Sequence, residues 1–237
     1  MANQGSLSER YFAISDRVAT AAKRANRGLE EITLIVVSKN HPASLVAELV
    51  DLGASQFGEN RDQEAAPKSV EVAALRPNAE IDWHFIGQLQ SNKVKSVLNY
   101  SKTVHSLDRP SLLQALIKEA SKKAEIEPRY QLDVLIQLNV TEDPNRGGIE
   151  PANLLQFAES VLVCPALKLR GVMGVASLER EASVDFETIA QASQKLRTLA
   201  PEATAISAGM SEDFEEAIGF GATHLRIGSA ITGNRTY

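Results

Sequence analysis

Apolar and polar positions alternate along the chain in blocks with two different periods. Short, mainly apolar runs, typical of strands buried on both faces of a parallel sheet, recur throughout the sequence. Each is followed by a segment whose apolar residues recur at helical spacing. The clearest run, 33–38, ends on one lysine, Lys39, and leads into a helix that begins near Pro42 and ends at Gly53. This pattern predicts a repeated strand–helix unit.

An amphipathic helix precedes the first unit, with Ser6 and Glu9 in a capping box and Gly28 at its end. The predicted strands are 33–38, 55–57, 82–86, 102–105, 132–140, 167–175, 204–206 and 223–227. The helices between them begin at Pro42, near Arg61 and at Ser91, then span 109–125, 151–162 and 184–199, with another from Ser211 and a short one after Gly228.

Eight strand–helix units in 237 residues predict an α/β protein, a (β/α)8 TIM-type barrel with an extra N-terminal helix, as one domain over 1–237. The alternative is an open doubly wound sheet. The first strand is not followed by the Gly-x-Gly-x-x-Gly pattern of that fold, and no break in composition indicates a second domain.

Composition narrows the possible functions. The net charge of −5 gives no general attraction for nucleic acid, and a single cysteine, Cys164, excludes an intramolecular disulfide. The polar N-terminus has no secretory signal, and no apolar run reaches the length of a membrane span. The four histidines lack metal-ligand spacing. We therefore expect a cytoplasmic protein without a metal site, membrane contact or nucleic-acid partner.

In a barrel of this kind, function resides in the loops that follow the strands. The loop after the seventh predicted strand contains Ser207 and Ser211, and the loop after the eighth contains Gly228 and Ser229. Small residues and hydroxyls at these two loops are typical of a phosphate cup. For Ser211 we favour a simpler role as N-cap of a helix over 212–219, whereas for Gly228 and Ser229 we favour phosphate binding.

Lys39 is the candidate reactive group. If its stem is packed at the strand end, burial lowers the pKa of its ammonium and favours the free amine that attacks a carbonyl. The alternative is that its head reaches solvent or pairs with a rim carboxylate such as Glu59. A phosphate-bearing aldehyde satisfies both the amine and the cup, and pyridoxal 5′-phosphate is the obvious candidate.

Arg226 is expected near the pyridine ring of such a cofactor, unless it forms a salt bridge at the rim. A guanidinium only donates hydrogen bonds, so it would keep the ring nitrogen unprotonated. An unprotonated pyridine is a weak electron sink, which disfavours carbanion chemistry.

Five segments together resemble the pyridoxal-phosphate homeostasis proteins, the YggS/PROSC group, which are similar to the isolated barrel domain of alanine racemase. The resemblance covers nearly the whole chain, and it depends on the order and spacing of the segments. They are Val36-Val37-Ser38-Lys39, Phe57-Gly58-Glu59-Asn60, Trp83-His84-Phe85-Ile86-Gly87 with Leu89-Gln90-Ser91-Asn92-Lys93, Ser207-Ala208-Gly209-Met210-Ser211 with Asp213, and Arg226-Ile227-Gly228-Ser229-Ala230-Ile231.

The resemblance implies a type III pyridoxal-phosphate fold with the cofactor held as an internal aldimine on Lys39. It implies phosphate contacts from Ser207, Gly228 and Ser229, with Arg226 at the pyridine nitrogen and Asn60 and Met210 around the ring. The implied function is vitamin B6 homeostasis, by a cofactor carrier that delivers to apo-enzymes. One departure is Arg146, where many relatives have a lysine; arginine does not form the imine.

Three functions remain open from the sequence. Racemisation needs a second base, which alanine racemase takes from a tyrosine outside the barrel domain, and none of Tyr11, Tyr100, Tyr130 and Tyr237 stands in a motif that places it at the rim. We therefore favour a monomeric carrier without catalytic residues over a low-activity amino-acid racemase or other pyridoxal-phosphate enzyme. The third possibility is a regulatory partner protein that senses the cofactor.

Overall fold

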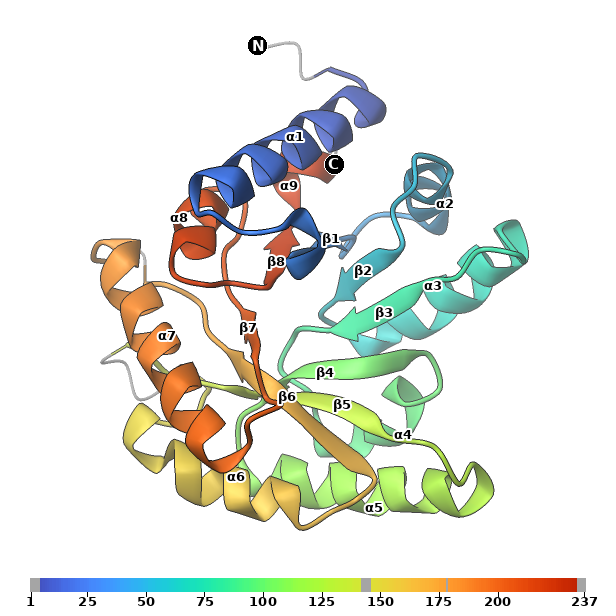
Figure 1. Ribbon diagram of the computed structural model, residues 1–237. Coiled ribbons are helices and arrows are strands. Elements are labelled where there is room, and N and C mark those ends of the chain that lie inside the picture. Colours follow the sequence, from blue (N-terminus) through green and yellow to red (C-terminus); the bar gives the residue numbers. More distant parts are fainter. Residues whose placement is uncertain (1–4, 142–145, 178, 234–237) are drawn as a thin grey trace.

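The computed structural model describes residues 5–141, 146–177 and 179–233. Eight parallel strands pair in sequence order, and the first also pairs with the last, so the sheet closes into a barrel (Figure 1). This confirms the predicted (β/α)8 barrel. The strands are β1 (Thr33–Val37), β2 (Gln56–Glu59), β3 (Asp82–Phe85), β4 (Ser101–Leu107), β5 (Leu132–Gln137), β6 (Leu167–Met173), β7 (Ala205–Ser207) and β8 (His224–Ile227).

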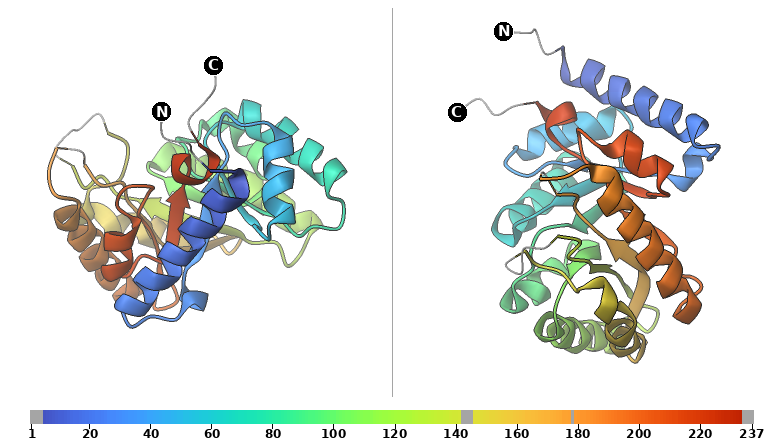
Figure 2. Two further views of the ribbon diagram at one scale, coloured as in Figure 1. Left: turned by 90° about the horizontal axis from the view of Figure 1, so that it is seen from above. Right: turned by 90° about the vertical axis from the view of Figure 1, so that its left-hand side faces the viewer.

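Helices surround the barrel, and the predicted N-terminal helix α1 lies across α8 and α9 (Figures 1 and 2). Arg10 of α1 donates from Nε to the carbonyl of Ile231 at 2.7 Å, which ties the helix to the end of the barrel. The helices are α1 (Leu7–Arg24), α2 (Ala43–Asp51), α3 (Asp62–Leu75), α4 (Val94–Val97), α5 (Pro110–Ile126), α6 (Leu154–Leu162), α7 (Ala182–Leu199), α8 (Phe214–Gly219) and α9 (Ser229–Thr232), with 3-10 turns η1 (Leu29–Glu31), η2 (Ser91–Lys93) and η3 (Pro151–Asn153).

The two faces of the sheet lie in different environments. Between strands and helices lies an apolar core that includes the fully buried Phe57, Phe186 and Phe214. Inside the barrel a small apolar cluster, Leu135, Met173 and Ala205, accompanies buried polar groups: His84, His105, Ser207 and Arg226. Polar side chains buried together inside a barrel must satisfy one another, so they mark the part of the interior with a specific arrangement.

Some element boundaries differ from those predicted. β5 ends at Gln137 instead of continuing to residue 140, and the segment after β3 forms only η2 and the single-turn α4. The expectation that Ser211 caps a helix over 212–219 is wrong, because α8 begins at Phe214 with Asp213 as its N-cap. The Ser211 hydroxyl instead accepts a bond from the N–H of Ala230 at 3.4 Å, across to the loop after β8.

Tyr237, one of the four tyrosines considered above, lies outside the described residues, as do residues 142–145 just before Arg146. Within the described ranges, no helix combines the length and the apolar character that a membrane crossing requires.

Candidate cofactor site

A cavity of about 520 Å³ opens where the barrel strands end at their carboxyl termini. It lies between the segments that follow β1, β2 and β3 on one side and those that follow β6, β7 and β8 on the other. Six of the seven predicted site residues line it: Lys39, Asn60, Met210, Arg226, Gly228 and Ser229. Residues far apart in the sequence are thus gathered at one rim.

Lys39 stands on a turn two residues beyond the end of β1. Ser38 is fully buried and Asn40 adopts a left-handed conformation with φ of 64°, so the chain turns outward between them. The Lys39 side chain is exposed, and its ammonium makes no hydrogen bond or ion pair with the described residues. The prediction of a packed stem is therefore wrong, and so is the alternative pairing with Glu59, whose partner is Lys68 at 2.7 Å.

Arg226 reaches the cavity from inside the barrel and is only 5% exposed. Its Nη1 donates to the hydroxyl of Ser207 at 2.6 Å, and its Nη2 donates to the carbonyl of Gly174 at 2.9 Å. Burial lowers the pKa of the guanidinium to about 10, so it stays charged at neutral pH. None of the ion pairs among the described residues involves Arg226, so it does not form the rim salt bridge considered above.

A line of hydrogen bonds runs from Arg226 through the barrel interior. The hydroxyl of Ser207 lies 2.8 Å from Nδ1 of His105, Nε2 of His105 lies 2.9 Å from Nδ1 of His84, and Nε2 of His84 lies 2.7 Å from Oε1 of Gln56. Arg226 can only donate and the Gln56 oxygen can only accept, so we assign every donor along the line to point from Arg226 toward Gln56. This arrangement has both histidines neutral, in agreement with their burial, which lowers the pKa of each.

The hydroxyl of Ser207 therefore makes its hydrogen bonds inside the barrel. It is fully buried, its hydroxyl accepts from Arg226 and donates to His105, and it does not line the cavity with the other six residues. The pattern of small residues after a strand cannot indicate whether a particular hydroxyl points into the barrel or toward its rim.

Buried neutral histidines make stability depend on pH. Burial lowers the pKa of His84 to about 3 and that of His224 to about 4. The unfolded chain binds a proton at each near pH 6.5 and the folded chain does not, so stability is present above that pH and is lost below it. We expect the free energy of unfolding to fall by about 2 kcal/mol per histidine between pH 7 and pH 5.

Urea unfolding at the two pH values measures this loss. His84→Gln keeps hydrogen-bonding capacity without a titrating ring. In this variant the fall in the free energy of unfolding between pH 7 and pH 5 should be smaller by the contribution of one histidine. An unchanged loss in this variant would contradict the assignment of a neutral His84.

The cavity is completed by Asn60 and by the loops after β7 and β8, which contain Ser211 and Ser229. The Oδ1 atom of Asn60 is buried and has no hydrogen-bond partner among the described residues, so it offers an unused acceptor. A Cβ atom at Gly87 would lie 2.2 Å from the carbonyl oxygen of Asn60, so only glycine lets the loop after β3 press against that backbone. Across the cavity, the hydroxyls of Ser211 and Ser229 lie 3.5 Å apart.

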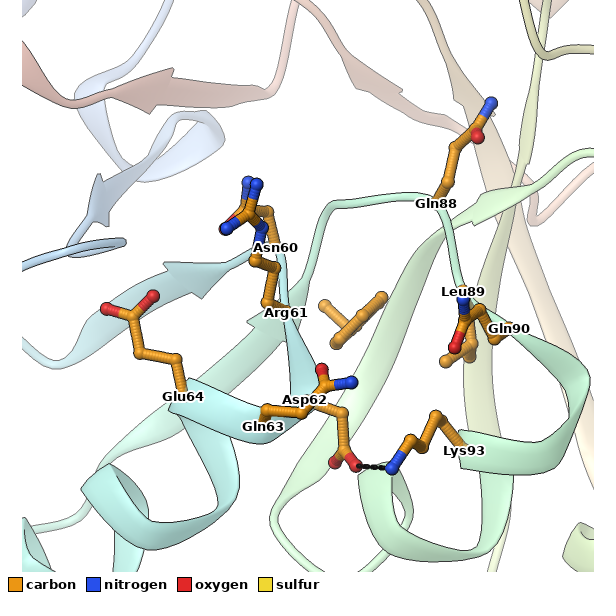
Figure 3. A pocket seen from close by; sticks show the side chains of 10 residues that line it. Asn60, Arg61, Asp62, Gln63, Glu64, Gln88, Leu89, Gln90 and Lys93 are labelled. Carbon is orange, nitrogen blue, oxygen red and sulfur yellow. Dashed lines mark ion pairs between the residues drawn. The ribbon is translucent and has the colours of Figure 1, made fainter.

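A second cavity of about 760 Å³ adjoins the first and shares Asn60 with it (Figure 3). Its wall comes from the start of α3 and from the segment after β3. Lys93 points toward Asp62, with Nζ 4.0 Å from Oδ2 (Figure 3).

Sequence reasoning missed a buried ion cluster beside the cavity, formed by Lys68 with Glu59 and Glu64. One signal could have found it. Lys68 shares the inward face of α3 with Ala65 and Val72, at helical spacing, so it stands where an apolar residue is expected. Elsewhere in the described chain, no group of three or more His, Cys, Asp or Glu side chains is arranged to hold a metal ion.

A barrel of this topology, with a lysine and a buried arginine facing one cavity at its mouth, defines a class with known members. Residues 11–236 match the model of the alanine racemase N-terminal domain. The alanine racemase of Corynebacterium glutamicum shares this fold at a TM-score of 0.67, with 12% identity over 95% of this chain and 61% of that one.

More similar relatives narrow the class. The pyridoxal phosphate homeostasis protein of Escherichia coli is 40% identical over 227 residues, 94% of each chain, and that of Pseudomonas aeruginosa is 36% identical over 98% of this chain and 96% of its own. The structure of PipY from Synechococcus elongatus with pyridoxal phosphate bound has a TM-score of 0.80 and 30% identity, covering 96% of this chain and all of that one. The chain belongs to the pyridoxal phosphate homeostasis protein family.

Proposed function

We propose that this protein binds pyridoxal 5′-phosphate covalently through Lys39 and acts as a carrier of this cofactor in vitamin B6 homeostasis. The observation that carries the proposal is the cavity itself, where the unpaired Lys39 amine stands at the same opening as the buried Arg226 and the Gly228–Ser229 segment. The cofactor-bound relative PipY and the names of the bacterial relatives support it.

The residues present fit this cofactor, which when bound supplies an aldehyde and an electron-accepting ring. Lys39 would supply the amine that captures the aldehyde as a C=N bond, with the loss of one water. Gly228 and Ser229 would hold the phosphate, with Met210 beside the ring. Arg226 would donate to the ring nitrogen, and the unused Oδ1 of Asn60 would accept a hydrogen bond from the ring hydroxyl.

Ser207 lies inside the barrel and does not line the cavity, but its hydroxyl accepts a hydrogen bond that orients Arg226. We therefore assign it a supporting role and leave the phosphate to the two rim loops.

The carrier function is favoured over racemisation because the described residues place no tyrosine at the cavity to act as the second base. No described tyrosine lines the cavity, and the hydroxyl of Tyr100 lies 3.4 Å from Asp62 on α3. An arginine at the ring nitrogen also leaves the ring a weak electron sink. No specific observation favours the racemase or the cofactor-sensing regulator.

Three further proposals follow from the carrier role. Pyridoxal-phosphate apo-enzymes are the recipients, the protein works in the cytoplasm where they are made, and it acts as a monomeric barrel spanning 1–237. Sedimentation in the presence and absence of pyridoxal phosphate measures the oligomeric state.

Spectroscopy and peptide mapping test the main proposal. Purified protein incubated with pyridoxal phosphate should develop an absorption band at the violet edge of the visible, and borohydride reduction should fix the label on Lys39. A label on another lysine would contradict the proposed site. Incubation of the loaded protein with D- or L-alanine, followed by chiral analysis, should show no conversion, and sustained turnover would overturn the carrier function.

A further inference from the structure

The turn that carries Lys39 is held by a second lysine. Lys68, on α3, donates from Nζ to the carbonyl of Ser38 at 2.9 Å, to Oε1 of Glu59 at 2.7 Å and to Oε1 of Glu64 at 2.8 Å. An ammonium has three N–H donors, so all of those on Lys68 are used. The residue immediately before Lys39 is thus fixed directly.

The two carboxylates extend the hold to both sides of Lys39. Glu59 Oε1 accepts a bond from the hydroxyl of Ser38 at 2.8 Å. Glu64 Oε1 accepts a bond from the backbone N–H of Asn40. Ser38 and Asn40 flank Lys39, so the ion cluster determines the path of the turn.

The two lysines differ in burial. Lys68 is 5% exposed and Glu59 is fully buried, whereas Lys39 is exposed and unpaired within the described chain. A buried charge needs partners, and removing one member of a buried ion pair leaves the charge of the other uncompensated. Lys68 therefore occupies two carboxylates that would otherwise attract the Lys39 ammonium.

We propose that Lys68 is a positioning residue for Lys39: with Glu59 and Glu64 it holds the turn 38–40 so that the Lys39 amine faces the cofactor cavity without an ion pair to either of these two carboxylates. The proposal rests on the proposed function. Only an uncharged amine can attack the aldehyde carbon to form C=N and release water, and an ion pair with a carboxylate stabilises the charged form instead. The structure thus distinguishes a lysine that reacts from a lysine that orients it.

The test is the rate at which pyridoxal phosphate labels Lys39, trapped with borohydride and quantified by peptide mass spectrometry. Lys68→Met combined with Glu59→Gln removes the cluster without leaving a buried unpaired charge. We expect labelling of Lys39 to slow about tenfold or more, because small misplacements of a reacting group have large kinetic effects. Lys68→Arg keeps the charge and should recover part of the rate.

Two further variants keep the test decisive. Glu64→Ala changes a partly exposed residue, so it should fold even where the double variant does not, and losing the bond to Asn40 should slow labelling measurably. Lys93→Met is the matched control. Lys93 is paired with Asp62 and makes no hydrogen bond or ion pair with the described residues of the turn, so Lys39 in this variant should be labelled at the wild-type rate.

Wild-type rates in both the Lys68→Met/Glu59→Gln and Glu64→Ala variants would overturn the positioning role. Failure of the wild-type protein to be labelled at Lys39 would instead overturn the proposed function. A label that shifts from Lys39 to other lysines would support positioning when the circular dichroism of the double variant matches that of the wild type, because unfolding, which also exposes other lysines, is then excluded.

Discussion

Lys39→Ala will lose covalent capture of pyridoxal phosphate. Among the described residues that line the cavity, Lys39 is the only lysine, so the variant has no amine at the position proposed for the aldehyde. Positioning a nucleophile next to its target is worth many orders of magnitude over reaction from solution, so we expect the labelling rate in the cavity to fall at least about 100-fold. The violet absorption band should disappear with it.

Two comparisons separate chemistry from binding in this experiment. Lys39→Arg keeps a positive charge that cannot form the C=N bond, so it should retain reversible affinity for the phosphate without the band. Because Lys39 is exposed and unpaired, its replacement should change the free energy of unfolding by less than about 0.5 kcal/mol. A band that survives in the alanine variant would place the anchor elsewhere.

Gly171→Ala is expected to destabilise the barrel strongly. Gly171 of β6 pairs with Ala205 of β7, and a Cβ atom built on Gly171 would lie 1.8 Å from the carbonyl oxygen of Ala205. This oxygen belongs to the backbone and cannot rotate away, so the two strands must separate. Overpacking against rigid neighbours costs 1–3 kcal/mol, and we expect a loss of about 3 kcal/mol here.

The loss should also reach the site, because β7 is only three residues long and ends at Ser207, which supports Arg226. Gly219→Ala is the matched control: Gly219 lies at the end of α8, and a Cβ there would meet no atom within 4 Å. Urea unfolding of both variants measures the difference. Equal stability of the two variants would show that the β6–β7 contact is softer than the structure indicates.

The barrel could be predicted from sequence because each apolar run and each helical pattern is a local feature. The gathering of Lys39, Asn60 and Gly228 at one rim then followed from the rule that parallel strands present their ends together. The side-chain environments could not be predicted. Whether Ser207 points inward, and whether Lys39 or Lys68 is buried, depends on contacts between segments far apart in the chain.

The exposure of Lys39 illustrates the physical reason. An apolar strand followed by a lysine suggests a packed stem. However, β1 ends at Val37, and the chain turns at Ser38, whose carbonyl accepts a hydrogen bond from Lys68 of α3. The partner that redirects the lysine is 29 residues further along. Hydrophobic periodicity does not identify such a partner, although the position of Lys68 on the inward face of α3, where an apolar residue is expected, could have indicated one.

The pairing of β1 with β8 has a consequence for the life of the protein in the cell. These strands are the first and the last of the barrel to be synthesised, and they form the seam at which Ile35 pairs with Arg226. The cavity exists only after the seam has closed, so under the proposed function a nascent chain would not yet hold the cofactor. A ligand that bridges the seam binds only the closed ring and stabilises it by about 2.7 kcal/mol at a hundred times its dissociation constant. Cofactor supply would then set how often the seam opens to proteases, and with it the rate at which the protein is degraded.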